Sequence, residues 1–406
     1  MNIIFIEPSF PANQREFVRA LHAVGANVIG VGERPAAYLS DDVKARLSDY
    51  VQVRSVVHEP SLLEAVKTIQ SRVWVDRLEA TVEAHIMAAA TVREATGIPG
   101  TSAETAFLCR DKPAMKEALR RAGVPCAQST KAHTPQDARD FVAAVGFPVI
   151  IKPPAGAGAS GTYRVGDADR LEQVIQASGL ADGQDVAVEE FIEGHEGFLD
   201  TLTVNGHVEH EFITHYYPNV LTAMRERWIS PQMVATNRIA AEGYGEVREM
   251  ARKVINILKI GTSATHMEWF ASPKGLRFSE IGCRPPGVGQ WDVYNAANEF
   301  DLYFEWAHAL AHGRAHTPPS RRYAGGMIAL RPQRDGHISG YSGVERIQNK
   351  YGDCIVAAHL PEPGTPTQPV EAGYMANAWL RMRHPDYDQL RYILDDVGET
   401  IKVHAE

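Results

Sequence analysis

The sequence predicts a multi-lobed protein in which an open parallel α/β lobe precedes α+β lobes. Three observations support this prediction. The chain has 406 residues, which is too long for one ordinary hydrophobic core. Strand-like and helix-like segments alternate up to about residue 105, as a parallel sheet requires. From residue 324 to the end the chain is rich in strand-like segments, which indicates a separate closing lobe.

The composition is typical of a folded, soluble protein, with 44% hydrophobic and 22% charged residues. The formal charge of -9 argues against a nucleic-acid partner, because neutralising the phosphates along a nucleic acid requires a basic face, but it leaves open a small, locally bound anion. Four cysteines without CxxC spacing indicate neither a disulfide framework nor a zinc cluster. No signal peptide and no apolar run of about 20 residues is visible. We therefore expect a cytoplasmic protein with no membrane partner.

The first lobe, residues 1–105, is predicted from alternating segments. Its helices are amphipathic, and the last of them ends at Gly97. The first strand is followed by Pro8 and not by a glycine turn, so the dinucleotide-binding fingerprint is absent. The expected strands and helices cover residues 2–7, 13–25, 26–32, 61–72, 73–78 and 81–97.

The second unit, residues 106–322, opens with a helix that Asp111 caps and Gly123 ends. A second helix follows Thr134, with Pro135 in its first turn. Later segments predict a mixture of strands and helices, including a tight hairpin at Asn205 and Gly206.

A glycine loop at 156–161 matches the pattern G-x-G-x-x-G, which alone is weak evidence of a nucleotide-binding loop. A dinucleotide loop must enter a helix, whereas a strand-like segment follows here. A Walker loop needs a lysine after its last glycine, and Thr162 stands there. The remaining functional interpretation is a flap between antiparallel strands whose amides close over nucleotide phosphates, beside Lys152. A surface hairpin with a solvated lysine is the alternative.

Two glutamates, Glu268 and Glu280, lie in apolar strands joined by a turn. A loop of three or five residues would place them opposite each other on one face, whereas two or four would separate them. We expect the same face. Opposed carboxylates repel unless a cation lies between them, and Mg²⁺ binds carboxylates together with nucleotide phosphates. Two solvated glutamates are the alternative.

Five motifs in order, DKPAMK, PVIIKPPAGAGASG, VEEFIEG, HMEWF and SEIGCRPPG, resemble those of the ATP-grasp superfamily. The pattern is similar to that of carboxylate-amine ligases, which include the L-amino-acid ligases, and more distantly to biotin carboxylase. The resemblance implies an N-terminal lobe at 1–105, an ATP-grasp domain at 106–322 and a C-terminal closing lobe at 323–406.

The resemblance also implies ATP and Mg²⁺ as cofactors, with one or two ions and with Mn²⁺ as a substitute. Lys152 and Arg284 take catalytic roles, in which Arg284 steadies an acyl phosphate. Many relatives carry Asn where this chain has Gly282, so water or bidentate Glu280 has to complete a second metal site. The implied phosphate-binding, flap, adenine-binding, ribose-binding and metal-binding residues are Lys112, Lys152, Gly156, Gly158, Ser160, Gly161, Glu189, Glu190, Phe191, Ile192, Glu196, Glu268 and Glu280.

The reaction implied by the resemblance joins a small-molecule carboxylate, such as an amino acid, to an amine through an acyl phosphate. Candidate substrate contacts are His266, Trp269, Arg227, Arg284 and Gly287, and structural roles are alternatives for them. A homodimer is left open. A carboxylase-type enzyme that uses bicarbonate and a non-catalytic nucleotide-binding protein are alternative functions.

Overall fold

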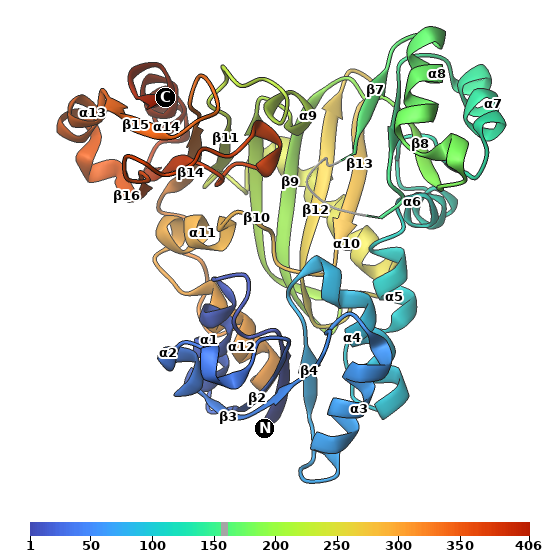
Figure 1. Cartoon of the computed structure of the whole chain (residues 1–406), viewed down its shortest axis with the longest axis vertical. Helices are drawn as coiled ribbons and strands as arrows, with labels where there is room; N and C mark the ends of the chain where they lie inside the picture. Colours follow the sequence, from blue (N-terminus) through green and yellow to red (C-terminus); the bar gives the residue numbers. More distant parts are fainter. Residues whose placement is uncertain (156–160) are drawn as a thin grey trace.

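The computed structural model describes residues 1–155 and 161–406, whose strands form four sheets. Figure 1 shows the N-terminal lobe at one end of the molecule, with a small α+β lobe and the C-terminal elements at the other end. A long twisted sheet lies between them and carries most of the residues that the motifs point to. The expected combination of a parallel α/β lobe and strand-rich α+β lobes is confirmed.

The N-terminal lobe is a parallel sheet in the strand order β3-β2-β1-β4. The first strand is apolar throughout and buried from Ile3 to Ile6, as expected for a strand that helices cover on both faces. Its strands are β1 (Asn2–Ile6), β2 (Asn27–Gly32), β3 (Leu47–Gln52) and β4 (Arg77–Glu79), and its helices are α1 (Gln14–Ala23), α2 (Asp41–Lys44), α3 (Glu59–Gln70) and α4 (Ile86–Thr96).

The small lobe contains an antiparallel sheet in the order β5-β8-β6-β7. Strands β6 and β7 flank residues 156–160 and run antiparallel, as predicted for a flap hairpin. The predicted flap residues Gly156, Gly158 and Ser160 lie outside the described residues. The elements are β5 (Ser129–Ala132), α7 (Pro135–Val145), β6 (Val149–Lys152), β7 (Tyr163–Val165), α8 (Ala168–Ala177) and β8 (Val186–Glu190).

The large sheet has eight strands in the order β13-β12-β9-β10-β11-β14-β17-β16. Asn205 and Gly206 connect β9 to β10 with φ angles of 51° and 83°, which fits the predicted tight hairpin. Strand β14 pairs with β11, so hydrogen bonding runs on without interruption past residue 322. The strands are β9 (His195–Val204), β10 (His207–Tyr217), β11 (Gln232–Ala235), β12 (Ser263–Ser272), β13 (Gly275–Gly282), β14 (Ala324–Leu330), β16 (Ile355–His359) and β17 (Ala378–His384).

The β12–β13 hairpin places Glu268 directly opposite Glu280, as expected. The predicted loop of three or five residues between the two strands was wrong. Ser272 pairs with Gly275, so the loop has only two residues and a regular ladder would send the two glutamates to opposite faces. A β-bulge follows, because Trp269 pairs with Phe278 and leaves Ser279 without a partner in the register. This extra residue returns Glu280 to the face of Glu268.

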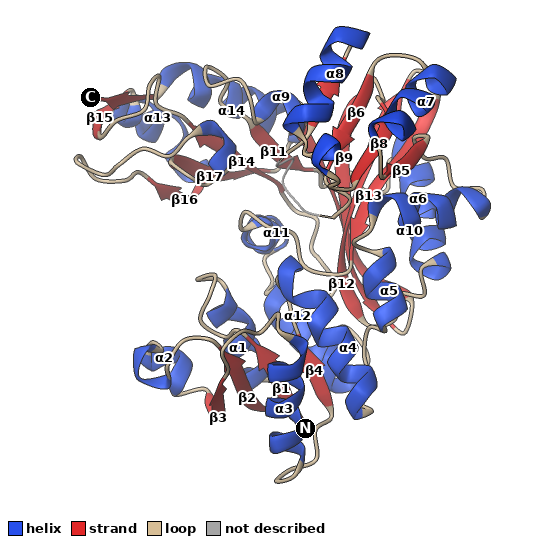
Figure 2. Ribbon diagram, turned by 45° about the vertical axis from the view of Figure 1, so that its right-hand side comes forward, coloured by secondary structure: helices blue, strands red, loops and turns tan. Residues whose placement is uncertain are grey.

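Helices connect the lobes. In Figures 1 and 2, α12 (Leu302–His312) lies beside α1, so a segment from far along the chain completes the N-terminal lobe.

The C-terminal lobe contains helices in addition to its predicted strands. None of the helices in the described ranges has both the length and the apolar character needed to cross a bilayer. The remaining elements are α5 (Ala103–Leu108), α6 (Lys112–Arg121), α9 (Val220–Ala223), α10 (Gly245–Ile257), α11 (Gln290–Asn298), β15 (Ile338–Ser342), α13 (Val344–Tyr351), α14 (Tyr387–Thr400) and β18 (Lys402–Ala405).

Candidate active site

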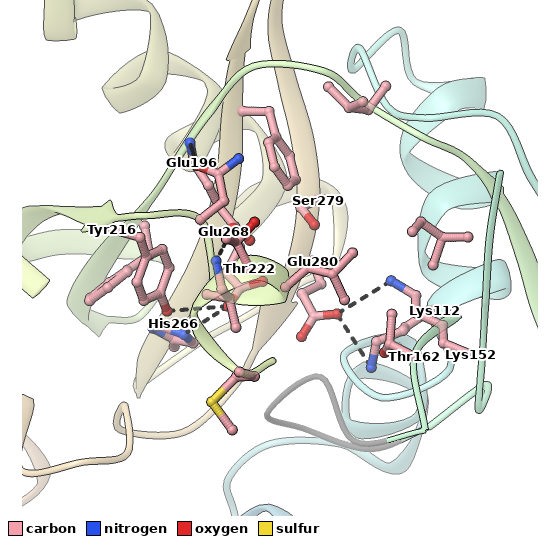
Figure 3. A pocket seen from close by; sticks show the side chains of 18 of the residues that line it. Lys112, Lys152, Thr162, Glu196, Tyr216, Thr222, His266, Glu268, Ser279 and Glu280 are labelled. Carbon is pink, nitrogen blue, oxygen red and sulfur yellow. Dashed lines mark hydrogen bonds and ion pairs between the residues drawn. The ribbon is translucent and has the colours of Figure 1, made fainter. Parts of the chain in front are cut away.

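A cavity of about 820 Å³ lies between the small lobe and the large sheet, and it collects most of the predicted site residues. Figure 3 shows side chains from β12 and β13 facing lysines of the small-lobe side across this space. The predicted residues that line it are Lys112, Lys152, Glu189, Glu190, Phe191, Ile192, Glu196, His266, Glu268, Glu280, Arg284 and Gly287.

Two candidate substrate residues do not line this cavity. Trp269 is 4% exposed and belongs to a hydrophobic core, because it alternates with Glu268 and points to the opposite face of β12. Arg227 points away and forms an ion pair with Asp335 at 2.7 Å. Gly161, at the end of the predicted flap, has φ of +65° and is not among the lining residues.

Glu280 is the centre of a lysine–carboxylate cluster. Its Oε2 atom lies 3.3 Å from Lys112 Nζ and 4.0 Å from Lys152 Nζ, and dashed lines in Figure 3 mark both contacts. Asp111 caps α6 through its side chain, which accepts from the amide of Ala114, so Lys112 starts the helix at a fixed place. The cap therefore helps to hold one of the two cations that neutralise Glu280.

Lys116 is a third lysine of this site, and the sequence prediction missed it. Its Nζ lies 2.6 Å from Glu189 Oε2, and the residue is 1% exposed. A signal was present in the sequence, because Lys116 stands four residues after Lys112 and so shares its helix face. Burial lowers the pKa of Lys116, although the Glu189 carboxylate opposes this effect.

Glu189 bridges two lysines, because its Oε2 atom also lies 2.9 Å from Lys152 Nζ. Burial alone would raise the pKa of Glu189, but the charges of Lys116 and Lys152 outweigh it and lower the pKa to about 2. Burial likewise opposes the charge on Lys152, while Glu189 and Glu280 raise its pKa. The carboxylate of Glu189 thus holds the lysines in place. The predicted adenine contact at 189–192 stays a prediction.

Glu196 lies in the same cavity and is only 6% exposed. Its Oε2 accepts a hydrogen bond of 2.7 Å from the amide of Val220. Burial and the neighbouring charge of Glu268 raise the pKa of Glu196 to about 8. The predicted ribose contact of this residue is not tested by these contacts.

His266 contacts both a buried aspartate and an expected metal ligand. Its Nδ1 atom lies 2.6 Å from Asp200 Oδ1, and its Nε2 atom lies 3.6 Å from Glu268 Oε1. Tyr294 donates a 2.5 Å hydrogen bond to the other oxygen of Asp200. Burial opposes protonation of His266, but the Asp200 carboxylate outweighs it and raises the pKa to about 9. A positively charged ring therefore faces the cavity beside Glu268.

Arg284 lies two residues after the end of β13, and its side chain is 14% exposed. Its Nε atom donates to Glu83 Oε2 at 2.8 Å, and its Nη1 atom donates to the carbonyl oxygen of Pro285 at 2.8 Å. The two prolines after Arg284 disfavour helix at this point and hold the chain extended. The guanidinium therefore remains near the strand that carries Glu280.

The segment after β10 forms the opposite wall of the cavity. Arg225 reaches from it to the small lobe and donates to the carbonyl oxygen of Thr162 at 2.8 Å. The sequence analysis did not single out Gln290 and Tyr374, which also line the cavity. Gln290 is 0% exposed and Tyr374 is 6% exposed. The Oε1 of Gln290 and the hydroxyl of Tyr374 have no hydrogen-bond partner within the described part of the chain. Both atoms are buried in the wall of the cavity.

The donor set at the hairpin suits Mg²⁺ bound together with phosphates. Glu268 and Glu280 are opposite in register and line one cavity. In residues 1–155 and 161–406 no group of three or more histidine, cysteine, aspartate or glutamate side chains is arranged to hold a metal alone. An ion here would take the rest of its ligands from phosphate oxygens and water, which is how Mg²⁺ usually binds.

Comparison with known proteins agrees with this geometry. Residues 117–300 match the ATP-grasp domain family. The L-arginine-specific L-amino acid ligase of Bacillus subtilis is 28% identical over 220 residues, which cover 53% of this chain and 52% of that protein. The matched region therefore spans about half the length of that relative. A formate-dependent phosphoribosylglycinamide formyltransferase of Erythrobacter litoralis is 26% identical over 345 residues, covering 81% and 82%.

Solved structures show the same fold over the whole chain. The L-amino acid ligase from Bacillus licheniformis superposes with a TM-score of 0.74 at 16% identity, covering 100% of this chain and 98% of that chain. The N5-carboxyaminoimidazole ribonucleotide synthetase from Thermotoga maritima gives 0.68 at 18% identity, covering 100% and 99%.

Residues 117–300 therefore carry an ATP-grasp domain, and the proteins to which this chain is similar include L-amino acid ligases. This agrees with the resemblance that the sequence motifs predicted.

Proposed function

We propose that this protein is an ATP-dependent ligase that joins a small-molecule carboxylate to an amine through an acyl phosphate. The observation that carries the proposal is the placement of Glu268 and Glu280 opposite each other, beside Lys112 and Lys152, with Arg284 lining the same cavity. Phosphoryl transfer from ATP depends mostly on positioning and charge neutralisation, and these residues provide both.

In the first step a carboxylate oxygen of the acid attacks the γ-phosphorus of ATP, and the bond to the leaving ADP oxygen breaks. Lys112 and Lys152 exchange their contacts with Glu280 for contacts with phosphate oxygens when the nucleotide binds. Glu268 and Glu280 are the residues that would hold Mg²⁺, and a bound ion would supply neutralisation of charge on the phosphoryl group.

In the second step the amine nitrogen attacks the acyl carbon, the bond to phosphate breaks, and the nitrogen loses a proton. The products are an amide, ADP and phosphate. Arg284 holds the oxygens of the acyl phosphate, because a planar guanidinium forms paired hydrogen bonds that lysine cannot. No side chain has to act as a covalent nucleophile in this sequence of steps.

The acid that we propose is an amino acid. The cavity is lined by both acidic and basic side chains, among them Glu268 and Arg284, and an amino acid presents charged groups complementary to such side chains. The likeness to an L-arginine-specific L-amino acid ligase supports this substrate class.

The test is ATP-dependent phosphate release with pairs of amino acids, followed by mass spectrometry of the amide product. Bicarbonate supplied as the acid distinguishes a carboxylase. Glu280→Gln is expected to lower turnover by about 100-fold or more, because it weakens the metal site and the lysine contacts. Glu249→Gln, on the exposed side of α10, is the matched control and should leave turnover unchanged. Phosphate release by no pair above background would contradict the ligase proposal.

A further inference from the structure

Glu83 joins the N-terminal lobe to the active-site arginine. It lies in a short helical turn, Glu83–His85, after β4, and its Oε2 accepts the 2.8 Å hydrogen bond from Arg284 Nε. The two side chains are 23% and 14% exposed, so water screens this pair less than it screens a surface salt bridge. A residue 201 positions earlier in the chain thus restrains the guanidinium beside the cavity.

Glu83 is itself held by a second arginine. Arg110 lies just before the capping residue Asp111, and its Nη1 atom is 3.8 Å from Glu83 Oε1. The same guanidinium donates to the backbone carbonyl oxygen of Glu83. Because both the side chain and the main chain of Glu83 are held, its carboxylate has little freedom to leave Arg284.

Gly282 lies next to the Glu83 carboxylate, with room for a Cβ atom but not for a long side chain in the same direction. A Cβ atom placed on Gly282 would lie 3.5 Å from Glu83 Oε2 and 3.5 Å from Arg284 Cγ. A longer polar side chain at this position would extend into the region of that carboxylate. The backbone of Gly282 does not need a glycine, since its φ is not in the left-handed region.

We propose that Glu83 is a positioning residue for Arg284, and that the absence of a long side chain at residue 282 leaves room for its carboxylate. This inference rests on the proposed function. The carboxylate comes from the N-terminal lobe, so docking of that lobe on the ATP-grasp domain completes the site. Glu83 acts through Arg284, because its carboxylate orients the guanidinium fork toward the cavity.

A double-mutant cycle tests whether Glu83 works through Arg284. Glu83→Gln should lower kcat for phosphate release about 10-fold with KM for ATP unchanged, and Glu83→Asp should restore part of the loss. In an Arg284→Lys background, Glu83→Gln should change kcat less than twofold, because the guanidinium that it orients is gone. Glu64→Gln, an exposed position on α3 of the same lobe, is the matched control and should leave kcat unchanged. Equal losses from Glu83→Gln in both backgrounds would overturn the inference.

A substitution at Gly282 tests the spatial part of the inference independently. Gly282→Asn in the wild-type background should lower kcat, because the amide competes for the space of the Glu83 carboxylate. In a Glu83→Ala background the same substitution should no longer lower it. A loss of the same size in both backgrounds would contradict the spatial argument. Far-ultraviolet circular dichroism of each variant establishes that the fold is retained.

A chemical probe separates this inference from the ligase proposal. Phenylglyoxal modifies arginine side chains, and peptide mapping by mass spectrometry follows Arg284 alone. Glu83→Gln should increase the modification rate of Arg284 several-fold, while Glu64→Gln should not. If the wild-type protein releases no phosphate with any acid, the ligase proposal fails, but this rate still decides whether Glu83 holds Arg284. An unchanged rate would overturn the positioning role.

Discussion

Replacement of Glu189 by glutamine removes the one carboxylate that touches both Lys116 and Lys152. The pKa of Glu189 falls from an ordinary 4.5 to about 2, which corresponds to about 3 kcal/mol of stability at neutral pH. Removing one partner of a buried pair costs about 3 to 5 kcal/mol in other proteins, which agrees. We therefore expect Glu189→Gln to lower the free energy of unfolding by about 3 kcal/mol at pH 7.

The companion variant Lys116→Met should cost less, about 1 kcal/mol. Methionine fills a similar volume, and Glu189 keeps Lys152 as its partner at 2.9 Å. Urea unfolding followed by circular dichroism measures both changes, with Glu249→Gln as the control. If Glu189→Gln cost under 1 kcal/mol, or no more than Lys116→Met, the proposed role of Glu189 as the shared counter-ion would be refuted.

The pH dependence of the same variant follows from the sign of the shift. The folded pKa of Glu189 is depressed, so its stabilisation is fully present above the unfolded value of 4.5 and is lost as the pH falls toward about 2. The difference in unfolding free energy between wild type and Glu189→Gln should therefore be constant from pH 7 to about pH 5 and shrink below it. A difference that grew on acidification would contradict this sign.

Two further predictions concern the packing of β9 against the core residue Trp269 and one wall of the cavity. Gly197→Ala should lower the free energy of unfolding in urea by about 3 kcal/mol, because a Cβ atom at this position would lie 2.5 Å from the ring of Trp269. Gly243→Ala is the control and should not change this free energy, because a Cβ atom there would meet nothing within 4 Å. Arg225→Gln should weaken ATP binding about fivefold in calorimetry, because it removes the hydrogen bond to Thr162 that connects the cavity wall to the small lobe. An unchanged affinity for ATP would show that this contact does not shape the nucleotide site.

Local patterns predicted the parts of the site that lie on one stretch of chain. Strand and loop patterns pointed to the paired glutamates and to the lysine that ends β6, and the family resemblance pointed to Arg284; all of them line one cavity. Lys116 could have been found in the same way, since it follows Lys112 by one helical turn. The spacing of residues alone does not show that a lysine is buried, however, and it was the pairing with Glu189 that made Lys116 part of the site.

Features that depend on tertiary contacts could not be predicted from the sequence. The prediction placed Glu268 opposite Glu280 by assuming a loop of three or five residues, but the actual register depends on a two-residue turn and a bulge at Ser279. A bulge leaves no reliable pattern in one sequence, because any residue type can be the extra one. Trp269 was misjudged because its neighbours in sequence are site residues, although strand alternation sends it into the core.

The lobes expected from sequence share one site, and this limits how far they act as separate domains. Strand β14 continues the sheet of the ATP-grasp region past residue 322, so the expected closing lobe adds hydrogen-bonded strands to that sheet. Helix α12 packs on α1 of the N-terminal lobe, and Glu83 of that lobe reaches Arg284. Small motions between lobes would change the distance between Glu83 and Arg284 before they changed either lobe internally. The arginine contact is therefore the place where the docking of the N-terminal lobe acts on the chemistry that we propose.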